Sequence, residues 1–258
     1  MVPDWLRRGV EYALFYLLLG FFALMCLLWS LPAALLVRLL PGSIGLPLGQ
    51  AAISLGFRLF LALLRGAGLL RCDLSALDAL RDEGGIVIAP NHPSLLDAVL
   101  VTSRLPRVVC IAKASIWDNI LLGGGMRLAG YVRNDAPLPM IRKAAGAVQA
   151  GRQLLIFPEG TRTPVGIGGA GPLGPFSRSF AVIAQRAGAP VQTVVIECDS
   201  PYLRKGWPIF RKPVLPLCYR VRLGQRFLPQ GDAQAVSDGV EHYLRGALGH
   251  PVGERRAG

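Results

Sequence analysis

Two long apolar runs open the chain and set its first quarter apart from the rest. No charged residue lies between Glu11 and Arg38, and in helical form this interval measures about 39 Å, more than the ~30 Å hydrocarbon core of a bilayer. A second apolar run extends from Leu46 to Leu64, after a break at Pro41. A secretory signal would have a shorter apolar region and a small-residue cleavage site. The pattern therefore predicts two apolar helices.

The charges around these runs bear on how they meet a membrane. Arg58 lies inside the second run, and an arginine at mid-bilayer costs ~2.5–3.5 kcal/mol on insertion scales, so this run is expected to lie shallow or to face protein. Arg7, Arg8 and Arg38 flank the first run on both sides and do not orient a single span. We favour a hairpin over residues 1–68, spanning or confined to one leaflet, because it returns the chain to its starting side. An ordinary buried helix pair is the alternative, and it suits the second run better than the first.

The pattern changes at Arg71, where short β-rich runs begin to alternate with stretches that have helical periodicity. The expected strands are 86–89, 108–112, 154–157, 191–196 and 219–223, and the expected helices are 95–104, 116–128, 138–150, 179–187 and 233–248. This alternation predicts an α/β domain over residues 69–250, with a mostly parallel sheet flanked by helices. Residues 251–258 are expected to form a flexible tail.

The amino-acid composition indicates contact with a membrane and with an anionic partner. Of the 258 residues, 52% are hydrophobic and 17% are charged, whereas soluble domains carry about a quarter charged residues. The net charge of +12 favours phospholipid headgroups, phosphorylated substrates or nucleic acid as partners. Aromatic platforms interleaved with basic residues are absent, so no nucleic-acid partner is expected. The five cysteines show no CxxC spacing, and no cofactor fingerprint or metal-ligand cluster is present, so neither a metal nor a cofactor is expected.

The segment NHPSLLD, residues 91–97, carries the first candidate for chemistry. His92 follows an expected strand, and Pro93 is placed to open the next helix, so His92 is expected at the carboxyl edge of the sheet. Asp97 comes about one helical turn later, and the His92 ring can turn back toward it. A histidine held by a carboxylate is a general base that can activate a hydroxyl nucleophile. A helix-capping histidine beside a surface aspartate explains this spacing equally well until a second signal is found.

That second signal is FPEGTR, residues 157–162. The expected strand stops at the proline, and Gly160 permits a tight turn that presents Glu159, Thr161 and Arg162 at the same sheet edge as His92. A guanidinium can clamp a phosphate bidentately, and a glutamate can orient that arginine or an acceptor hydroxyl. Backbone N–H groups near Gly160 are candidate donors to an oxyanion. A turn with only a structural role does not need three polar side chains in four residues, so we favour a functional role for this segment.

These two segments at this spacing resemble the 1-acylglycerol-3-phosphate acyltransferase family, also called lysophospholipid acyltransferases, over roughly residues 70–229. Three shorter blocks agree, at residues 112–124, 130–133 and 189–191. The resemblance implies the fold of glycerolipid acyltransferases and an N-terminal membrane-docking helix pair. It also implies His92 as the general base, Asp97 as its partner, and Arg133, Glu159 and Arg162 as acceptor-binding residues.

The resemblance further implies an acyl-ACP or acyl-CoA donor, a lysophospholipid-like acceptor with a hydroxyl nucleophile, and contact with membrane lipids. We expect an inner, cytoplasmic membrane location with the catalytic domain facing the cytoplasm. Lys113 is either a contact to acceptor phosphate or an ordinary solvated lysine at a strand end. A serine-arginine-serine run at residues 177–179 departs from the family pattern, as does Thr193, which stands where a proline is common. The same chemistry on another acceptor, an aminolipid or a polyketide- or lipid-like alcohol, therefore stays open, and a non-catalytic membrane-surface module is the remaining alternative.

Overall fold

The computed structural model describes residues 3–163, 173–208 and 210–249. In this part of the chain a seven-stranded sheet runs through the molecule in the order β1-β7-β6-β2-β5-β3-β4. The strands are β1 Leu70–Asp73, β2 Ile86–Pro90, β3 Val108–Lys113, β4 Val132–Asn134, β5 Gln153–Leu155, β6 Val191–Cys198 and β7 Leu217–Phe227. The five strands β6, β2, β5, β3 and β4 are parallel to one another, whereas β7 is antiparallel to β6 and carries β1 parallel to itself. The expected mostly parallel α/β sheet is therefore confirmed.

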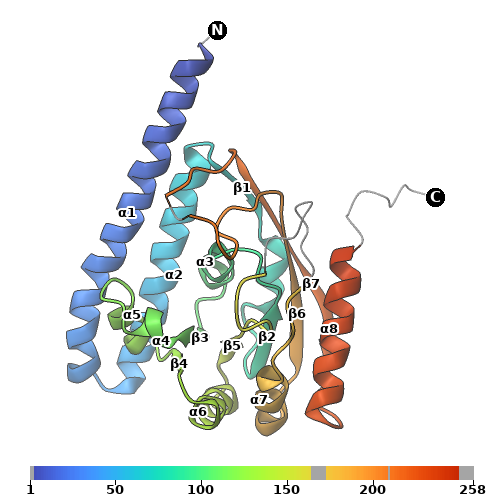
Figure 1. The fold of residues 1–258 in the computed structure, drawn as a ribbon. Coiled ribbons are helices and arrows are strands. Elements are labelled where there is room, and N and C mark those ends of the chain that lie inside the picture. Colours follow the sequence, from blue (N-terminus) through green and yellow to red (C-terminus); the bar gives the residue numbers. More distant parts are fainter. Residues whose placement is uncertain (1–2, 164–172, 209, 250–258) are drawn as a thin grey trace.

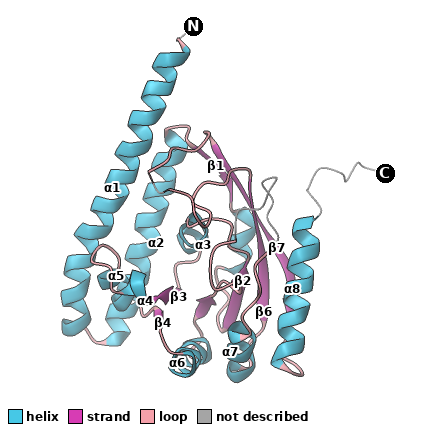
Figure 2. Cartoon of the chain, viewed as in Figure 1, coloured by secondary structure: helices cyan, strands magenta, loops and turns pink. Residues whose placement is uncertain are grey.

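Helices cover both faces of the sheet (Figures 1 and 2). The helices are α1 Asp4–Leu39, α2 Gly42–Gly66, η1 Ser75–Leu80, α3 Leu96–Arg104, α4 Ala114–Trp117, α5 Gly123–Leu128, α6 Pro137–Gln149, α7 Ser179–Ala187 and α8 Ala233–Gly249. One apolar core joins α2, α3 and η1 to one face of the sheet, and a second core joins α6, α7 and α8 to the other. This two-sided burial explains why the central strand β2 is apolar at every position.

Besides the short helix η1, which was not predicted, the structure differs from the sequence expectations in two strands and one helix. The strands β1 and β4 were not predicted, because runs of four and three residues carry little periodicity. The helix expected over residues 116–128 is instead two short helices, α4 and α5. Within α5, a Cβ at Gly124 would lie 2.0 Å from the carbonyl oxygen of Ser30, so the glycine lets α5 approach α1 closely. The expected flexible tail, residues 251–258, lies outside the described residues.

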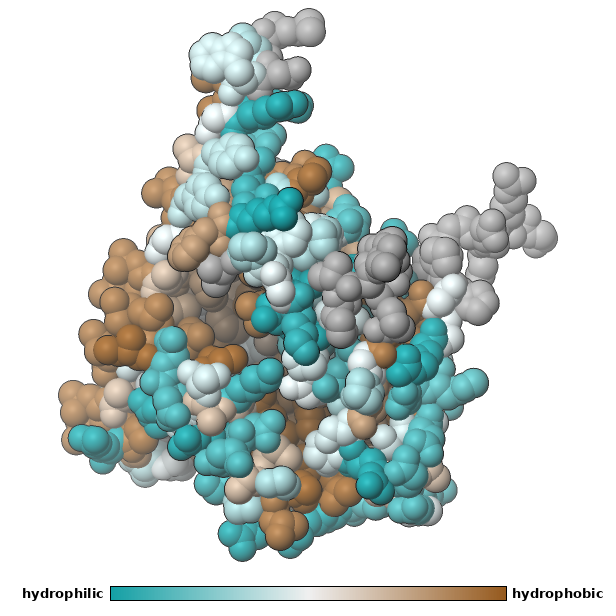
Figure 3. All heavy atoms as spheres, viewed as in Figure 1, coloured by the Kyte–Doolittle hydropathy of each residue, from teal (hydrophilic) through white to brown (hydrophobic). Residues whose placement is uncertain are grey.

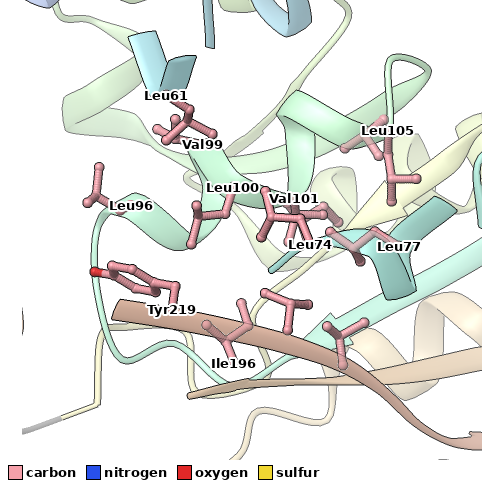
Figure 4. Packing of buried hydrophobic residues seen from close by; sticks show 14 of the residues in the cluster. Leu61, Leu74, Leu77, Leu96, Val99, Leu100, Val101, Leu105, Ile196 and Tyr219 are labelled. Atoms are coloured by element: carbon pink, nitrogen blue, oxygen red, sulfur yellow. The ribbon is translucent and has the colours of Figure 1, made fainter. Parts of the chain in front are cut away.

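The first two helices pack against the sheet domain as well as against each other. Buried residues of α2, among them Phe60, Leu61 and Leu64, belong to the core that includes α3 and the sheet. Figure 4 shows Leu61 beside Val99 of α3 within this cluster. The division into segments 1–68 and 69–250 stays a prediction, but the two segments share one hydrophobic core.

Polar contacts reinforce this packing. Arg58 donates from Nε to the carbonyl oxygen of Ser103 over 2.7 Å, and Gln50 donates to the carbonyl oxygen of Ala129 over 3.2 Å. Arg58 thus faces protein, which confirms one of the two positions expected for a charged residue in an apolar run. Because the Arg58 guanidinium is bound to protein, the opposite side of α2 can still contact an apolar environment.

The outer side of the helix pair is strongly apolar. Leucines of α1 such as Leu17, Leu28 and Leu35 are more than half exposed, and Leu55 of α2 is 67% exposed. Figure 3 shows these apolar side chains gathered on one side of the molecule, over α1 and α2. Both helices are long and apolar enough to cross a membrane by length and composition. Exposed apolar surface on this scale is typical of a protein or membrane contact.

We predict that Gly49→Ala loosens the attachment of α2. A Cβ at this position would lie 2.5 Å from the backbone nitrogen of Ala129, and backbone atoms cannot swing away as a side-chain end does. Overpacking of this kind costs about 1–3 kcal/mol. The control is Gly20→Ala in α1, where a Cβ meets nothing within 4 Å and helix propensity alone is expected to add up to ~1 kcal/mol. Thermal unfolding in detergent measures both variants, and a Gly49→Ala protein as stable as the control would contradict this packing.

Candidate active site

His92 lies in the turn between the carboxyl end of β2, at Pro90, and the start of α3, at Leu96. The expectation that Pro93 opens the helix is wrong, because the helix begins three residues later. The additional turn lets the chain double back, so that Asp97 in the first turn of α3 faces His92. The carboxyl edge of the sheet is where open α/β folds place their sites.

The two side chains form a direct pair. His92 Nδ1 lies 2.9 Å from Asp97 Oδ2, and the same oxygen accepts the backbone N–H of Ser94 over 2.7 Å. The Asp97 side chain is fully buried, whereas the His92 side chain is 14% exposed. A carboxylate only accepts hydrogen bonds, so Nδ1 carries the proton and Nε2 is left as the basic atom. The geometry therefore holds the imidazole in the tautomer that a general base requires.

Burial dominates the electrostatics of Asp97. Loss of water raises the pKa of its carboxyl group, while the His92 ring and the Ser94 N–H act in the opposite direction. The other carboxylate oxygen, Oδ1, is buried without a hydrogen-bond partner in the described part of the chain, and so is the hydroxyl of Tyr219. Figure 4 shows the Tyr219 ring projecting from β7 toward the turn that precedes Leu96. Burial raises the pKa of Tyr219 well above its ordinary value, so this hydroxyl stays protonated near Asp97.

Neighbouring motif residues fix the turn that carries His92. The His92 ring stacks on Phe157 with ring centroids 3.8 Å apart. Asn91 exchanges two hydrogen bonds with the backbone of Ile196 in β6, at 2.9 and 2.7 Å. Phe157 and Asn91 belong to the two segments found in the sequence, yet sequence reasoning gave neither a role. Their contacts join residues far apart in the sequence, and membership of the two motifs was the only signal for them.

Glu159 does not orient Arg162, contrary to one of the two roles that its sequence position suggested. Its Oε1 accepts the backbone N–H of His92 over 3.1 Å and the hydroxyl of Thr163 over 2.9 Å. Its Oε2 accepts the N–H of Gly174 over 2.9 Å. The carboxylate is buried and ties the turn at residues 157–163 to the turn that carries His92. Because three donors converge on it, it acts as a brace between the two motifs.

The basic residues of the expected headgroup site are separated from one another. Arg162 donates from one guanidinium nitrogen to the carbonyl oxygens of Leu203 and Arg204, at 2.9 and 3.1 Å. Arg133 lies on β4, three strands away from β2, and pairs with Asp118 at 3.1 Å and with Asp135 at 3.2 Å. Arg162 follows β5, and β3 lies between β5 and β4, so the two guanidinium groups have separate partners in this structure.

The remaining candidates lie at the ends of strands and in the tight turn. Lys113 ends β3 with an exposed side chain. Gly160 is exposed and has φ +61°, the left-handed conformation that the turn requires of it. Its N–H donates to the carbonyl oxygen of Phe157 over 2.9 Å, so this N–H is already engaged and is not a free oxyanion donor. Thr161 is half-buried beside it. Among the described residues, no group of three His, Cys, Asp or Glu side chains gathers as metal ligands would.

The fold is similar to that of a solved acyltransferase. The crystal structure of the 1-acyl-sn-glycerophosphate acyltransferase PlsC from Thermotoga maritima matches with a TM-score of 0.67 at 19% identity, over 97% of this chain and 100% of that one. Residues 71–197 match the family model described as Acyltransferase. This segment is just under half of the chain, and through it the chain resembles the acyltransferase family.

Two named relatives show which kind of acyltransferase the chain resembles. A 1-acyl-sn-glycerol-3-phosphate acyltransferase of Helicobacter pylori is 30% identical over 121 residues, which are 45% of this chain and 49% of that protein. One from Cocos nucifera is 35% identical over 113 residues, 41% of this chain and 35% of that protein. The resemblance seen in the sequence is thereby confirmed. The chain spans about half or less of the length of these curated relatives.

We predict that Glu159→Gln weakens both the fold of the site and its activity. An amide presents only one acceptor oxygen and places N–H groups against N–H donors, and a buried donor left without a partner costs about 1–3 kcal/mol. Glu241→Gln is the matched control, since Glu241 forms an i,i+4 pair with Arg245 on the surface, where such pairs contribute up to ~1 kcal/mol. Unfolding midpoints and turnover are compared for the two variants. Equal stability of both would show that Glu159 is not a brace.

Proposed function

We propose that this protein transfers a fatty acyl chain from a thioester donor to the hydroxyl of a lysophosphatidate-like acceptor. The observation that carries the proposal is the buried Asp97 held 2.9 Å from His92 Nδ1 at the carboxyl edge of the sheet. The family match and the names of the relatives support the same chemistry. Acyl-CoA or acyl-ACP supplies the chain, and no covalent enzyme intermediate is required.

The proposed reaction is a single acyl transfer. The acceptor oxygen attacks the thioester carbonyl carbon while His92 Nε2 takes the hydroxyl proton. Asp97 stabilises the imidazolium that forms, the new C–O bond replaces the C–S bond, and the thiolate leaves and receives the proton from His92. Thioesters have a good leaving group, so the acceptor alcohol itself serves as the nucleophile.

A different acceptor is the second candidate, and the surroundings of the arginines favour it. Arg162 is bound to two carbonyl oxygens, and Arg133 is paired with two carboxylates. A phosphate bound at either guanidinium has to displace or share these contacts. An alcohol without a phosphate, such as a lipid-like alcohol, needs no such exchange. The proposed roles of Arg133, Arg162, Thr161 and Lys113 in acceptor binding depend on which acceptor is used.

Membrane attachment through α1 and α2 completes the proposal. The apolar outer side of the helix pair suits a lipid contact, and the shared core then holds the sheet domain close to the surface where a lysolipid resides. We place the protein at the inner, cytoplasmic membrane with its catalytic domain on the cytoplasmic side, where acyl donors are made.

Replacement of the base tests the function directly. His92→Ala is expected to lower the rate of acyl transfer by at least ~10²-fold, because general base catalysis is lost. Purified protein in detergent receives an acyl-CoA and either lysophosphatidate or monoacylglycerol, and mass spectrometry follows the products. His242→Ala, on α8, is the control and should keep full activity. Turnover near the wild-type rate in His92→Ala would refute the mechanism, and equal use of both acceptors by the wild type would favour the phosphate-free alternative.

The membrane assignment has its own test. The double variant Leu17→Glu and Leu28→Glu changes two side chains of α1 that are 67% and 63% exposed, so the core is untouched. Binding to uncharged phosphatidylcholine vesicles is expected to fall at least tenfold, because each leucine buried in lipid contributes about 1.5–3 kcal/mol. Leu138→Glu with Leu228→Glu changes residues that are 79% and 58% exposed outside the helix pair and should leave binding unchanged. Equal flotation of the two double variants with vesicles would place the membrane contact elsewhere.

A further inference from the structure

A cleft of about 1090 Å³ opens next to the His92 turn and has no part in the chemistry described so far. Asn91 and Pro93, the residues on either side of His92, line one end of it. Its walls come from the ends of β6 and β7, from β1, and from the last turn of α8. Its size is that of a small-molecule site and far exceeds the volume of one phosphate group.

Arginine dominates the charge of this cleft. Five arginines line it against three carboxylates, among the described residues: Arg65, Arg71, Arg204, Arg220 and Arg245 against Asp73, Glu197 and Asp199. The carboxylates are already engaged. Glu197 pairs with Arg222 at 3.2 Å, Asp199 accepts the N–H of Cys218, and Asp73 accepts both the N–H and the hydroxyl of Ser75. The cleft is therefore suited to an anionic ligand, and planar guanidinium groups suit phosphate in particular.

The sheet register places two of these arginines on one wall. Arg71 of β1 lies opposite Cys218 of β7, and Arg220 is two residues beyond Cys218. Residues two apart on a strand point to the same face, so Arg71 and Arg220 share a face of the sheet. Glu197 lies opposite Arg220 on the neighbouring strand β6. Arg222, the ion-pair partner of Glu197, donates to the carbonyl oxygen of Ala247 in α8. Arg71, Arg220 and Glu197 therefore lie on the face of the sheet that α8 covers.

The backbone separation between the end of β2, two residues before His92, and this wall bears on which phosphate the wall fits. Pro90 lies opposite Val194, and Glu197 is three residues further along β6, with Arg220 one strand beyond. Two strand spacings and three residues correspond to roughly 14 Å between the backbones of Pro90 and Arg220. The phosphorus of a glycerol phosphate lies four bonds from the reacting hydroxyl oxygen, at most ~5 Å away. A phosphopantetheine arm places about thirteen bonds, or ~16 Å, between its sulfur and its phosphate.

We propose that the arginine-lined cleft binds the phosphate end of a phosphopantetheine-type acyl donor, with the thioester lying at the His92 turn. Both carriers of acyl thioesters, coenzyme A and an acyl carrier protein, present this phosphate, so the shared chemistry is the phosphopantetheine arm. Arg71 and Arg220 contact the phosphate, and the acceptor approaches His92 separately from the arm. This assignment deepens the proposed acyl transfer, because it names where the donor lies.

Direct binding tests the cleft without catalysis. The full chain carrying His92→Ala is titrated in detergent with coenzyme A, 4′-phosphopantetheine and pantetheine, so the measured affinities do not depend on turnover. We expect the two phosphorylated ligands to bind at least tenfold more tightly than pantetheine. The double variant Arg71→Gln and Arg220→Gln should abolish that difference while leaving pantetheine unchanged.

The control removes the same charge from another surface. Arg142→Gln with Arg186→Gln alters two exposed arginines on α6 and α7 and should preserve the preference for phosphorylated ligands. An equal loss in both double variants would mean that net charge alone attracts the ligand and would overturn the site. A parallel titration with lysophosphatidate distinguishes the source of the phosphate. If the double variant Arg71→Gln and Arg220→Gln loses lysophosphatidate binding but keeps coenzyme A binding, the cleft belongs to the acceptor and the donor assignment is overturned. If the wild type binds coenzyme A in this way but transfers no acyl group, the assignment of the cleft is supported and the proposed reaction is refuted.

Discussion

A fully buried carboxylate next to a slightly exposed imidazole is the constraint around which this structure is arranged. Asp97 has lost its water, and an ionised carboxyl group in such a place is stable only if hydrogen-bond donors replace that water. The Ser94 N–H and the His92 ring supply those donors, and both come from the turn that Asn91 anchors to β6. The position of the base therefore depends on the whole central part of the sheet.

Glu159 extends the same principle to the second motif. Its carboxylate collects a backbone N–H from the His92 turn, a hydroxyl from Thr163 and an N–H from Gly174. A single buried side chain thereby fixes the relative position of two segments that lie 67 residues apart in sequence. Phe157, stacked on the imidazole, limits rotation of the ring from one side. Rigid placement of this kind is what a general base needs in order to meet its substrate at hydrogen-bond distance.

The helix pair connects this site to its expected surroundings. One side of α2 is buried in the same core as α3, whose first turn carries Asp97, while the outer sides of α1 and α2 stay apolar and exposed. Because the helix pair shares a core with the sheet domain, it stays in a fixed position relative to the site. A lipid held at the outer side of the pair and a donor arm held in the arginine-lined cleft would then approach His92 from different directions.

Local signals in the sequence determined a large part of this molecule. The two apolar runs, the main strands and the helix at residues 179–187 follow from periodicity and length, which are properties of neighbouring residues. The pairing of His92 with Asp97 also needs only five residues of chain. The motif at residues 157–162 indicated a functional turn because so many polar residue types gather in it. These features depend on interactions at short sequence separation, so a single sequence suffices to expect them.

Only the tertiary structure shows which residues far apart in the sequence come into contact. Tertiary contacts give Arg133 and Arg162 different partners, and strand order joins β1 to β7 in the opposite direction to the central strands. The helix that periodicity predicts over residues 116–128 is divided into α4 and α5, with α5 packed closely on α1, and Glu159 binds backbone donors instead of the arginine three residues away. The arginine-lined cleft gathers residues of α2, β1, the segment after β6, β7 and α8, none of which share a motif. The physical reason is that the faces buried together, and the donors available to each buried acceptor, exist only once the strands have been ordered.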